Sequence, residues 1–368
     1  MKTLLLTHYA LYPQAQIQDF FKFIYQSEFG PGHLIKDPGA NFAYLNKEVS
    51  DKADWDIPFR EKNQLVDALG GNLCRIHLDV VNHGLNLTTL QRLFEFSAKA
   101  LRGTVEGYFD KLEILGALCA SGELPFSMDE FEQMMDGVRL EPKLAIHHTE
   151  TFRQSYFPAY RVVDGVFGEL LDVFVQIDAL LGEKQRVIVA IDGDCGSGKS
   201  SLARLFAQIY GCNVIPMDDF FLPFLRRTPQ RLAAPGGNID YERFLDEVLT
   251  PLACDKAFSY RPFNCMTGDF DTAVDVAPKA LTIVEGSYSQ HPLLRDCYDL
   301  TLFISIDNSQ QLERLLLRDG AALLERFIST WIPLEKQYHE AFSVKSKSMF
   351  SFENLKIPAI CKDENDNC

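Results

Sequence analysis

The sequence predicts an α/β fold, a doubly wound parallel sheet in the second half of the chain, preceded by a mostly α-helical first half. Apolar residues recur at helical spacing over the first ~160 residues. After residue 185, nearly continuous apolar runs alternate with helical stretches, and a glycine-rich turn follows the first run. We expect a helical domain over 1–160, a connecting helix over 161–184, a second domain over 185–361 and a flexible tail over 362–368.

The first half shows three apolar stripes with a spacing typical of amphipathic helices. No motif assigns a function to this half. Polar residues stand among apolar ones there, and Arg75, His77, Asp79 and His83 together suggest a metal cluster. Their spacing fits no standard site, so we expect surface or hydrogen-bonded histidines. The stripes are Ile17, Phe20, Phe21 and Ile24, then Leu90, Leu93, Phe94 and Leu101, then Tyr108, Leu112, Leu115 and Leu118; the other polar residues are Glu28, His33, His147 and His148.

The second half carries four apolar runs of the kind expected for strands buried on both faces. Each run is separated from the next by turn residues or by a segment with helical spacing, as a parallel sheet with crossover helices requires. The predicted strands are 186–191, 213–217, 280–284 and 300–306, and the predicted helices are 201–210, 241–252 and 309–318.

Charge and cysteine usage exclude several classes of protein. The net charge is −15; residues 1–183 hold 16 basic and 26 acidic residues, and residues 184–368 hold 20 and 25. Neither half is basic, so a general nucleic-acid or anionic-membrane binder is not expected. Nine cysteines without a C-x-x-C pair indicate reduced thiols. No apolar run approaches ~18 residues, so we expect a cytoplasmic protein without a membrane segment.

A phosphate-binding loop follows the first predicted strand. The stretch Gly193-Asp194-Cys195-Gly196-Ser197-Gly198-Lys199-Ser200 has the form G-x-x-x-x-G-K-S. Its glycines let successive backbone N–H groups point at phosphate oxygens, and the helix from Ser201 onward adds its positive end. In such a loop the Lys199 ammonium reaches the β- and γ-phosphates and the Ser200 hydroxyl binds Mg²⁺. The sequence therefore predicts a P-loop fold that binds ATP and Mg²⁺.

Carboxylates at the ends of two further strands indicate what the nucleotide is used for. Asp218 and Asp219 follow the second predicted strand, at the edge where ligands bind in such sheets. An aspartate there can accept the proton of a substrate hydroxyl during phosphoryl transfer, although either one can also be a turn or capping residue. Glu285 ends the third strand and is a candidate ligand for Mg²⁺, with a structural cap as the alternative.

The order of these motifs resembles the uridine kinase-like P-loop kinases, a group that includes pantothenate kinase and phosphoribulokinase. The resemblance rests on Gly193–Ser200, Asp218–Phe221 and Val284–Gly286, and continues in Asn238–Phe244 and Phe258–Pro262. It covers residues ~185–345, less than half of the chain.

The resemblance implies roles for individual residues. It implies that Asp218 is the general base, that Ser200 and Glu285 surround Mg²⁺, and that Lys199 stabilises the transferred phosphoryl group. It further implies an acceptor site with Asp219, Asp240, Tyr260 and Arg261, and phosphate-neutralising arginines Arg314 and Arg318 on the helix that leads into the lid. A helix N-cap for Asp240, packing for Tyr260 and a solvated helix face for the two arginines are the alternatives.

Two features depart from the uridine kinase pattern. No histidine follows Tyr260, since Phe263-Asn264-Cys265 stands there, and the lid segment 318–326 is short, with Arg326 its only further arginine. The aromatic segment Trp331–Tyr338 either closes over substrate or packs the last helix.

We therefore expect an ATP- and Mg²⁺-dependent kinase whose acceptor is a hydroxyl of a small, nucleoside-like metabolite. A pantothenate kinase-like vitamin kinase and a nucleotide-dependent switch whose helical half binds a protein partner are the alternatives. A homo-oligomer is compatible with either.

Overall fold

The computed structural model describes residues 1–31, 38–53 and 60–358. The chain divides into two compact units, Met1–Val175 and Gln176–Cys368. The border falls inside α9 (Leu171–Glu183). The single connecting helix expected over 161–184 is wrong, because this stretch holds the end of a strand (Tyr160–Asp164), a short helix (Gly165–Glu169) and then α9. The expected tail 362–368 and His33 lie outside the described residues. No helix in the described ranges has both the length and the apolar character needed to cross a membrane.

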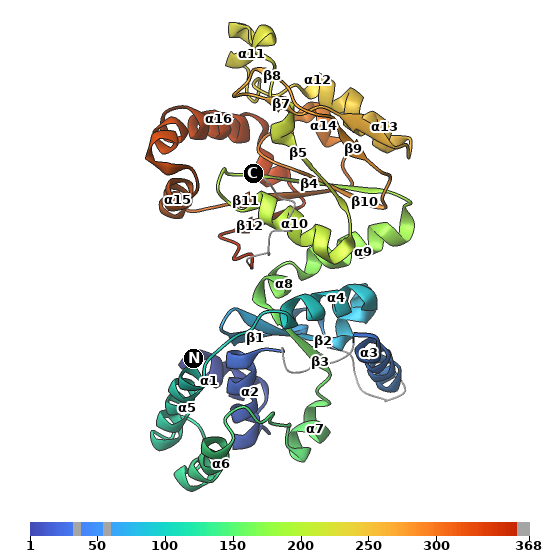
Figure 1. Ribbon diagram of the computed structural model, residues 1–368. Coiled ribbons are helices and arrows are strands. Elements are labelled where there is room, and N and C mark those ends of the chain that lie inside the picture. The colour runs from blue at the N-terminus through green and yellow to red at the C-terminus, as the bar shows by residue number, and fades with distance from the viewer. Residues whose placement is uncertain (32–37, 54–59, 359–368) are drawn as a thin grey trace. The chain divides into compact units, whose positions relative to one another are not determined.

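The first unit packs helices on a small antiparallel sheet, β1-β2-β3, that the sequence analysis did not predict. In Figure 1, α4 lies on one side of this sheet and α2 on the other. The helices are α1 (Lys2–Leu11), α2 (Ile17–Phe29), α3 (Pro38–Ala53), α4 (Leu87–Ala98), α5 (Val105–Ala120), α6 (Met128–Leu140), α7 (Glu150–Tyr156) and α8 (Gly165–Glu169), and the strands are β1 (Val66–Gly70), β2 (Leu73–His77) and β3 (Tyr160–Asp164).

The three apolar stripes of the first half form α2, α4 and α5, and their side chains build the core of the unit. Phe20, Phe21 and Ile24 of α2 are fully buried against Leu112 and Leu115 of α5. One member of the stripes was predicted wrongly: Leu101 follows the end of α4 and is fully exposed. The prediction of helices over this half is otherwise confirmed.

The second unit contains the predicted parallel sheet, five strands in the order β12-β11-β4-β10-β5. All four predicted strands are present, and β12, at the edge, was not predicted. Helix α10 packs against β4, β5 and β10, beside which it is seen in Figure 1. The strands are β4 (Val187–Gly193), β5 (Asn213–Pro216), β10 (Leu281–Glu285), β11 (Leu300–Ser305) and β12 (Phe350–Glu353), and α10 spans Lys199–Tyr210.

The chain reverses its direction across the sheet at β4. From β4 it crosses to β5 on one side, returns to β10 beside β4, and continues to β11 on the other side. In parallel sheets this switch point, at the carboxyl ends of the strands, is where ligands bind. The glycine-rich loop leaves β4 at this point.

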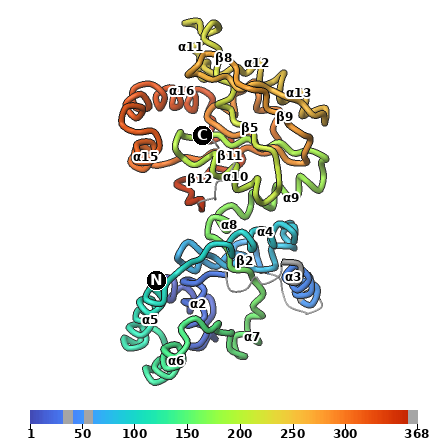
Figure 2. Tube along the Cα trace, viewed as in Figure 1, coloured from blue at the N-terminus to red at the C-terminus, as the bar shows by residue number. Residues whose placement is uncertain are grey.

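Shorter elements surround the sheet. The predicted helix 241–252 is interrupted by a wider turn at Leu245–Leu249, and Pro251, which lacks an N–H, stands in its last turn. Figure 2 traces the chain from β11 through α15 into α16, in the orange to red part of its colour range. These elements are α11 (Pro229–Ala233), α12 (Tyr241–Phe244), α13 (Thr250–Ala253), α14 (Pro292–Arg295), α15 (Asn308–Arg326), α16 (Ile332–Phe342) and α17 (Val344–Lys347), with β6 (Phe258–Tyr260) paired to β9 (Val274–Val276) and β7 (Phe263–Asn264) to β8 (Asp269–Phe270).

Candidate active site

The glycine-rich loop joins the end of β4 to the first turn of α10. Its first residue, Gly193, has φ +139°, and a Cβ there would lie 2.0 Å from the Ile304 carbonyl oxygen of β11. Only glycine therefore fits. The loop then curls, since the Ser197 N–H donates to the Asp194 carbonyl at 3.1 Å. The helix begins at Lys199, two residues earlier than predicted.

Lys199 lies inside the curl of this loop. Its side chain is buried, and its ammonium donates to the carbonyl oxygens of Gly193 and Asp194 at 2.9 and 2.8 Å. The other predicted nucleotide-binding residues, within Gly193 to Ser201, run from the end of β4 into the first turn of α10. A lysine held by neutral carbonyls keeps its positive charge available to an anion in the loop.

Asp218 and Glu285 lie on neighbouring strand ends near Lys199. Asp218 follows β5 in a short 3₁₀ turn, Met217–Phe220, and Glu285 is the last residue of β10. Burial raises the pKa of the Glu285 carboxyl, the Asp218 charge raises it further, and the Lys199 charge opposes them. The Ser200 side chain is hydrogen-bonded to Glu285.

Burial also raises the pKa of Asp218, while the charge of Lys199 lowers it and that of Glu335 raises it. Its side chain reaches solvent, although protein atoms crowd around it. The structure thus brings together Lys199, Ser200, Asp218 and Glu285, as the sequence motifs predicted. Two carboxylates that repel each other beside a hydroxyl form an oxygen donor set that suits Mg²⁺.

Asp219, the residue after Asp218, contacts Tyr260. The Tyr260 hydroxyl donates to Asp219 Oδ2 at 2.9 Å, and Tyr260 is buried. The Arg243 guanidinium, which was not predicted, donates to the Asp219 carbonyl at 2.9 Å and to the Arg261 carbonyl at 2.7 Å. Arg243 therefore ties the two predicted acceptor segments together.

Two predicted acceptor residues are held by neighbouring protein groups. The Asp240 carboxylate is buried, accepts from the Arg226 guanidinium at 2.6 Å and caps α12 by accepting from the Arg243 N–H at 3.3 Å. The Arg261 side chain is exposed and donates to the carbonyls of Phe270 and Asp271. The structure does not bring the guanidinium of Arg261 to the Asp219–Tyr260 pair.

The two predicted arginines lie on α15. Arg314 donates to the carbonyls of Gly196 and Ser197 at 3.2 and 3.4 Å, so it supports the glycine-rich loop. Arg318 is exposed and pairs with Asp319 at 2.8 Å, while its charge lowers the pKa of Asp218. Arg314 therefore contacts the glycine-rich loop directly, and Arg318 influences Asp218 through the electrostatic effect of its charge.

Sequence reasoning missed Glu335, although the segment Trp331–Tyr338 that contains it was singled out. Glu335 is buried, and its Oε2 accepts from the Cys195 N–H of the loop at 3.0 Å. The Ser287 hydroxyl contacts both the Glu335 carboxylate and, at 3.2 Å, the Gly193 carbonyl. A carboxylate thus holds a loop amide of the kind that phosphate oxygens use.

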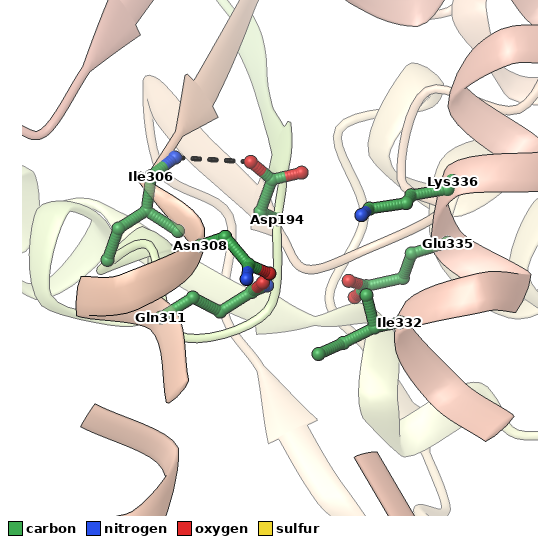
Figure 3. Close-up of a pocket in the computed structure, with 7 residues that line it drawn as sticks. All are labelled: Asp194, Ile306, Asn308, Gln311, Ile332, Glu335 and Lys336. Atoms are coloured by element: carbon green, nitrogen blue, oxygen red, sulfur yellow. Dashed lines mark hydrogen bonds between the residues drawn. The ribbon is translucent and has the colours of Figure 1, made fainter. Parts of the chain in front are cut away.

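Glu335 also lines a pocket against the loop. Figure 3 shows Glu335 and Lys336 of α16 pointing toward Asp194, whose carboxylate accepts from the Ile306 N–H at 3.1 Å. The opposite wall carries Asn308 and Gln311 of α15, and Ile306 and Ile332 complete the lining.

Asp192, the residue before the loop, is a second missed residue. Its carboxylate is fully buried and accepts from the Tyr338 hydroxyl at 2.8 Å and from the Tyr288 and Gln290 N–H groups. His339 of α16 lies 3.7 Å from Asp192 and 3.6 Å from Asp194. These contacts anchor helix α16 to the end of β4, and this holds the Glu335 carboxylate against the glycine-rich loop.

Comparison with known proteins agrees with this geometry. No protein-family model matches the chain. A uridine kinase from Bacillus licheniformis is 27% identical over 179 residues, with an alignment that covers 43% of this chain and 82% of that protein. A uridine kinase from a Geobacillus strain is 27% identical over 175 residues, with the same coverage. The chain is thus similar to uridine kinases over 43% of its length, which supports a uridine kinase-like P-loop kinase.

Solved structures are similar to about half of the chain. A possible uridine kinase from Bacillus stearothermophilus aligns with a TM-score of 0.37 and 19% identity, over 50% of this chain and 99% of that one. A putative fructose transport system kinase from Silicibacter aligns with a TM-score of 0.40 and 22% identity, over 50% and 98%. The prediction of a small-molecule kinase with an α/β domain is confirmed at this level by the sequence relatives and the observed sheet.

Proposed function

We propose that this chain transfers the γ-phosphoryl group of ATP to a hydroxyl of a small, nucleoside-like acceptor. The observation that carries the proposal is the placement of Asp218 beside Lys199 and Glu285, at the edge of the sheet where the phosphate loop opens. The acceptor class rests on the similarity to uridine kinases over 43% of the chain.

Each residue near the loop has a defined task in this mechanism. The loop amides and Lys199 bind the β- and γ-phosphates and stabilise the charge that develops during transfer. Asp218 accepts the proton of the acceptor hydroxyl as its oxygen attacks phosphorus. Asp219 and Tyr260, already joined by a hydrogen bond, line the side from which the acceptor approaches.

Ser200 and Glu285 would hold Mg²⁺. The fit rests on their hydrogen bond and on the raised pKa of Glu285 beside Asp218, because a divalent cation would relieve the repulsion between the two carboxylates. When bound, the ion neutralises phosphate charge.

The test is acceptor-dependent ADP release. The full chain is mixed with ATP, Mg²⁺ and, in turn, uridine, cytidine, adenosine and pantothenate, and ADP and phosphorylated product are quantified. We expect a nucleoside to raise ADP release at least ~10-fold and to appear as its monophosphate. Asp218→Asn should lower kcat on the order of 10²–10⁴-fold while ATP affinity changes little, and Lys199→Ala should weaken both.

Slow hydrolysis that no acceptor accelerates would refute the kinase proposal in favour of a nucleotide-dependent switch. Phosphorylation of pantothenate alone would place the chain with the vitamin kinases instead.

A further inference from the structure

The first unit contains a buried arginine, Arg75, that forms no ion pair with the residues that the structure describes. Arg75, in β2, is 1% exposed, and its Nε and Nη2 groups donate to the Gln26 Oε1 oxygen at 3.0 and 2.7 Å. The guanidinium stacks on Tyr160 and Phe23, 4.6 and 5.4 Å from the ring centres. In the part of the chain that the structure describes, no carboxylate oxygen lies within 4.0 Å of it. Burying a cation without a directly paired anion is costly, so an anion bound to the guanidinium would stabilise it.

The nearest acids are engaged elsewhere. Asp19 is fully buried, and its carboxylate accepts from His148 Nδ1 at 2.8 Å and from the Thr149 hydroxyl and N–H at 2.7 and 3.1 Å. Asp67 Oδ2 accepts from the Tyr12 hydroxyl at 2.7 Å and from His77 Nε2 at 3.0 Å. Each carboxylate therefore orients a histidine and neither is hydrogen-bonded to Arg75, although the Arg75 charge helps to lower the pKa of Asp67.

These bonds set the direction of a hydrogen-bond chain that ends near Arg75. Because Asp19 can only accept, the proton of His148 sits on Nδ1, and the bare Nε2 accepts from the Tyr160 hydroxyl at 2.7 Å. Gln26 Nε2 donates to the Tyr160 oxygen at 3.2 Å. Burial chiefly lowers the pKa of His148, to about 4, so the imidazole is neutral at pH 7.

Two further histidine nitrogens in this cluster lack partners. By the same logic His77 donates through Nε2, and its Nδ1 is buried without a hydrogen bond; His8 Nε2 is buried and unpartnered as well. His8 and Arg75 both contact the Phe23 ring, at 4.5 and 5.4 Å. The cluster thus offers polar atoms that no described residue satisfies.

Positive charge crowds on the accessible side of the cluster. The Lys22 ammonium donates to the Ile146 carbonyl at 3.0 Å, and burial together with repulsion from Arg75 and Arg153 lowers its pKa to about 8. Lys22 and Tyr160 are only half-buried, so solvent reaches this side. Like charges gather here although residues 1–183 carry 26 acidic and 16 basic residues.

We propose that Arg75, Lys22 and Tyr160 form a second ligand site, which binds the phosphate group of a small phosphorylated metabolite. A doubly charged phosphate would pair directly with Arg75 and Lys22, neither of which forms an ion pair with a described carboxylate, and the Tyr160 hydroxyl would position it. The site lies in the first unit and does not depend on the kinase activity of the second.

The test is histidine NMR on the full chain labelled at imidazole Cε1. The chain has eight histidines, and signals are assigned by single His→Asn substitutions. Inorganic phosphate, ribose 5-phosphate and acetate are titrated separately. We expect saturable shifts of the His148 and His77 signals with phosphate and ribose 5-phosphate, and at least ~10-fold weaker ones with acetate. His339, 3.6 Å from Asp194, reports separately on phosphate in the glycine-rich loop.

Matched variants decide the assignment. Lys22→Gln and Tyr160→Phe should each weaken the phosphate response of His148 about 10-fold or more while His339 responds as before. Tyr44→Phe, on the exposed face of α3, is the control and should change nothing. An unshifted His148 signal, equal responses to acetate and phosphate, or a normal response in both variants would overturn the proposal. Because Lys22 and Tyr160 are half-buried, their variants test it even if an Arg75 variant fails to fold.

Discussion

Replacing Glu335 by glutamine should tighten nucleotide binding. The Glu335 carboxylate occupies the Cys195 N–H at 3.0 Å and is held there by Ser287. A triphosphate in the loop needs the same amide and would meet a buried negative charge. We therefore expect ATP binding to break the hydrogen bond between Cys195 and Glu335. The free energy of that bond then makes the binding free energy of the nucleotide less favourable.

The size of the effect follows from the bonds involved. A hydrogen bond to a charged group contributes about 1.5–3 kcal/mol, and a neutral one about 0.5–1.5 kcal/mol. Glutamine keeps an acceptor oxygen and removes the charge, so the contact should weaken by about 1–1.5 kcal/mol. Since 1.4 kcal/mol is tenfold, the Kd should fall about 5- to 12-fold.

The assay is calorimetric titration of a non-hydrolysable ATP analogue with Mg²⁺. Glu340→Gln removes the same charge from an exposed position on α16 and is the matched control. Affinity that is unchanged or weaker in Glu335→Gln, or equally tightened in Glu340→Gln, would refute the competition between carboxylate and phosphate.

Three further predictions concern the carboxylates of the kinase unit. The pKa of Asp218 is raised and the base must be ionised, so the decrease of kcat/KM on acidification should begin at a higher pH than for an ordinary aspartate, as a pH–rate profile would show. A kcat/KM that stays unchanged down to pH 4 would contradict this. The raised pKa of Glu285 means that its stabilising contribution is fully present below its ordinary pKa and is lost as pH rises through the folded value. Glu285→Gln should therefore raise the Tm of the metal-free protein at pH 7, as calorimetry would show, while lowering kcat. Unchanged or lowered Tm would count against the repulsion. Asp240→Asn keeps the cap on α12 but loses the ion pair with Arg226, so chemical denaturation should show a free energy of unfolding lower by about 1–2 kcal/mol. A raised KM for the acceptor with kcat unchanged would indicate a substrate contact in addition. A variant as stable as the parent would refute the structural role.

The sheet of the kinase unit was predictable because its strands are local apolar runs. Strands β4, β10 and β11 are buried along nearly their whole length, so their composition marks them without knowledge of their neighbours. β12 has only four residues at the sheet edge, with half-buried and exposed residues alternating, and it lacks that mark.

β2 was missed for a different reason. All five of its residues are buried, yet two of them are Arg75 and His77, which look like surface residues in the sequence. Their burial depends on Gln26 and Asp67, 49 and 10 residues away. A polar residue whose partners come from other elements gives no local sign that it is inside.

The candidate site shows the same division. The loop 193–200 and Asp218 follow strands directly, so their positions could be inferred from strand ends. Glu335 reaches Cys195 from 140 residues away, through the anchoring of α16 by Asp192 and Tyr338. Only the folded arrangement reveals that contact.

The close approach of Gly193 to β11 separates two constraints that a glycine-rich motif usually combines. A side chain at position 193 would collide with main-chain atoms of Ile304 whether or not a nucleotide is ever bound. The Lys199 ammonium, in contrast, is hydrogen-bonded to carbonyls of its own loop. In a descendant that had lost phosphoryl transfer, we expect Gly193 to be retained because the sheet requires it, whereas Lys199 could be replaced by other residues. The identity of residue 199 therefore indicates whether catalysis is still under selection.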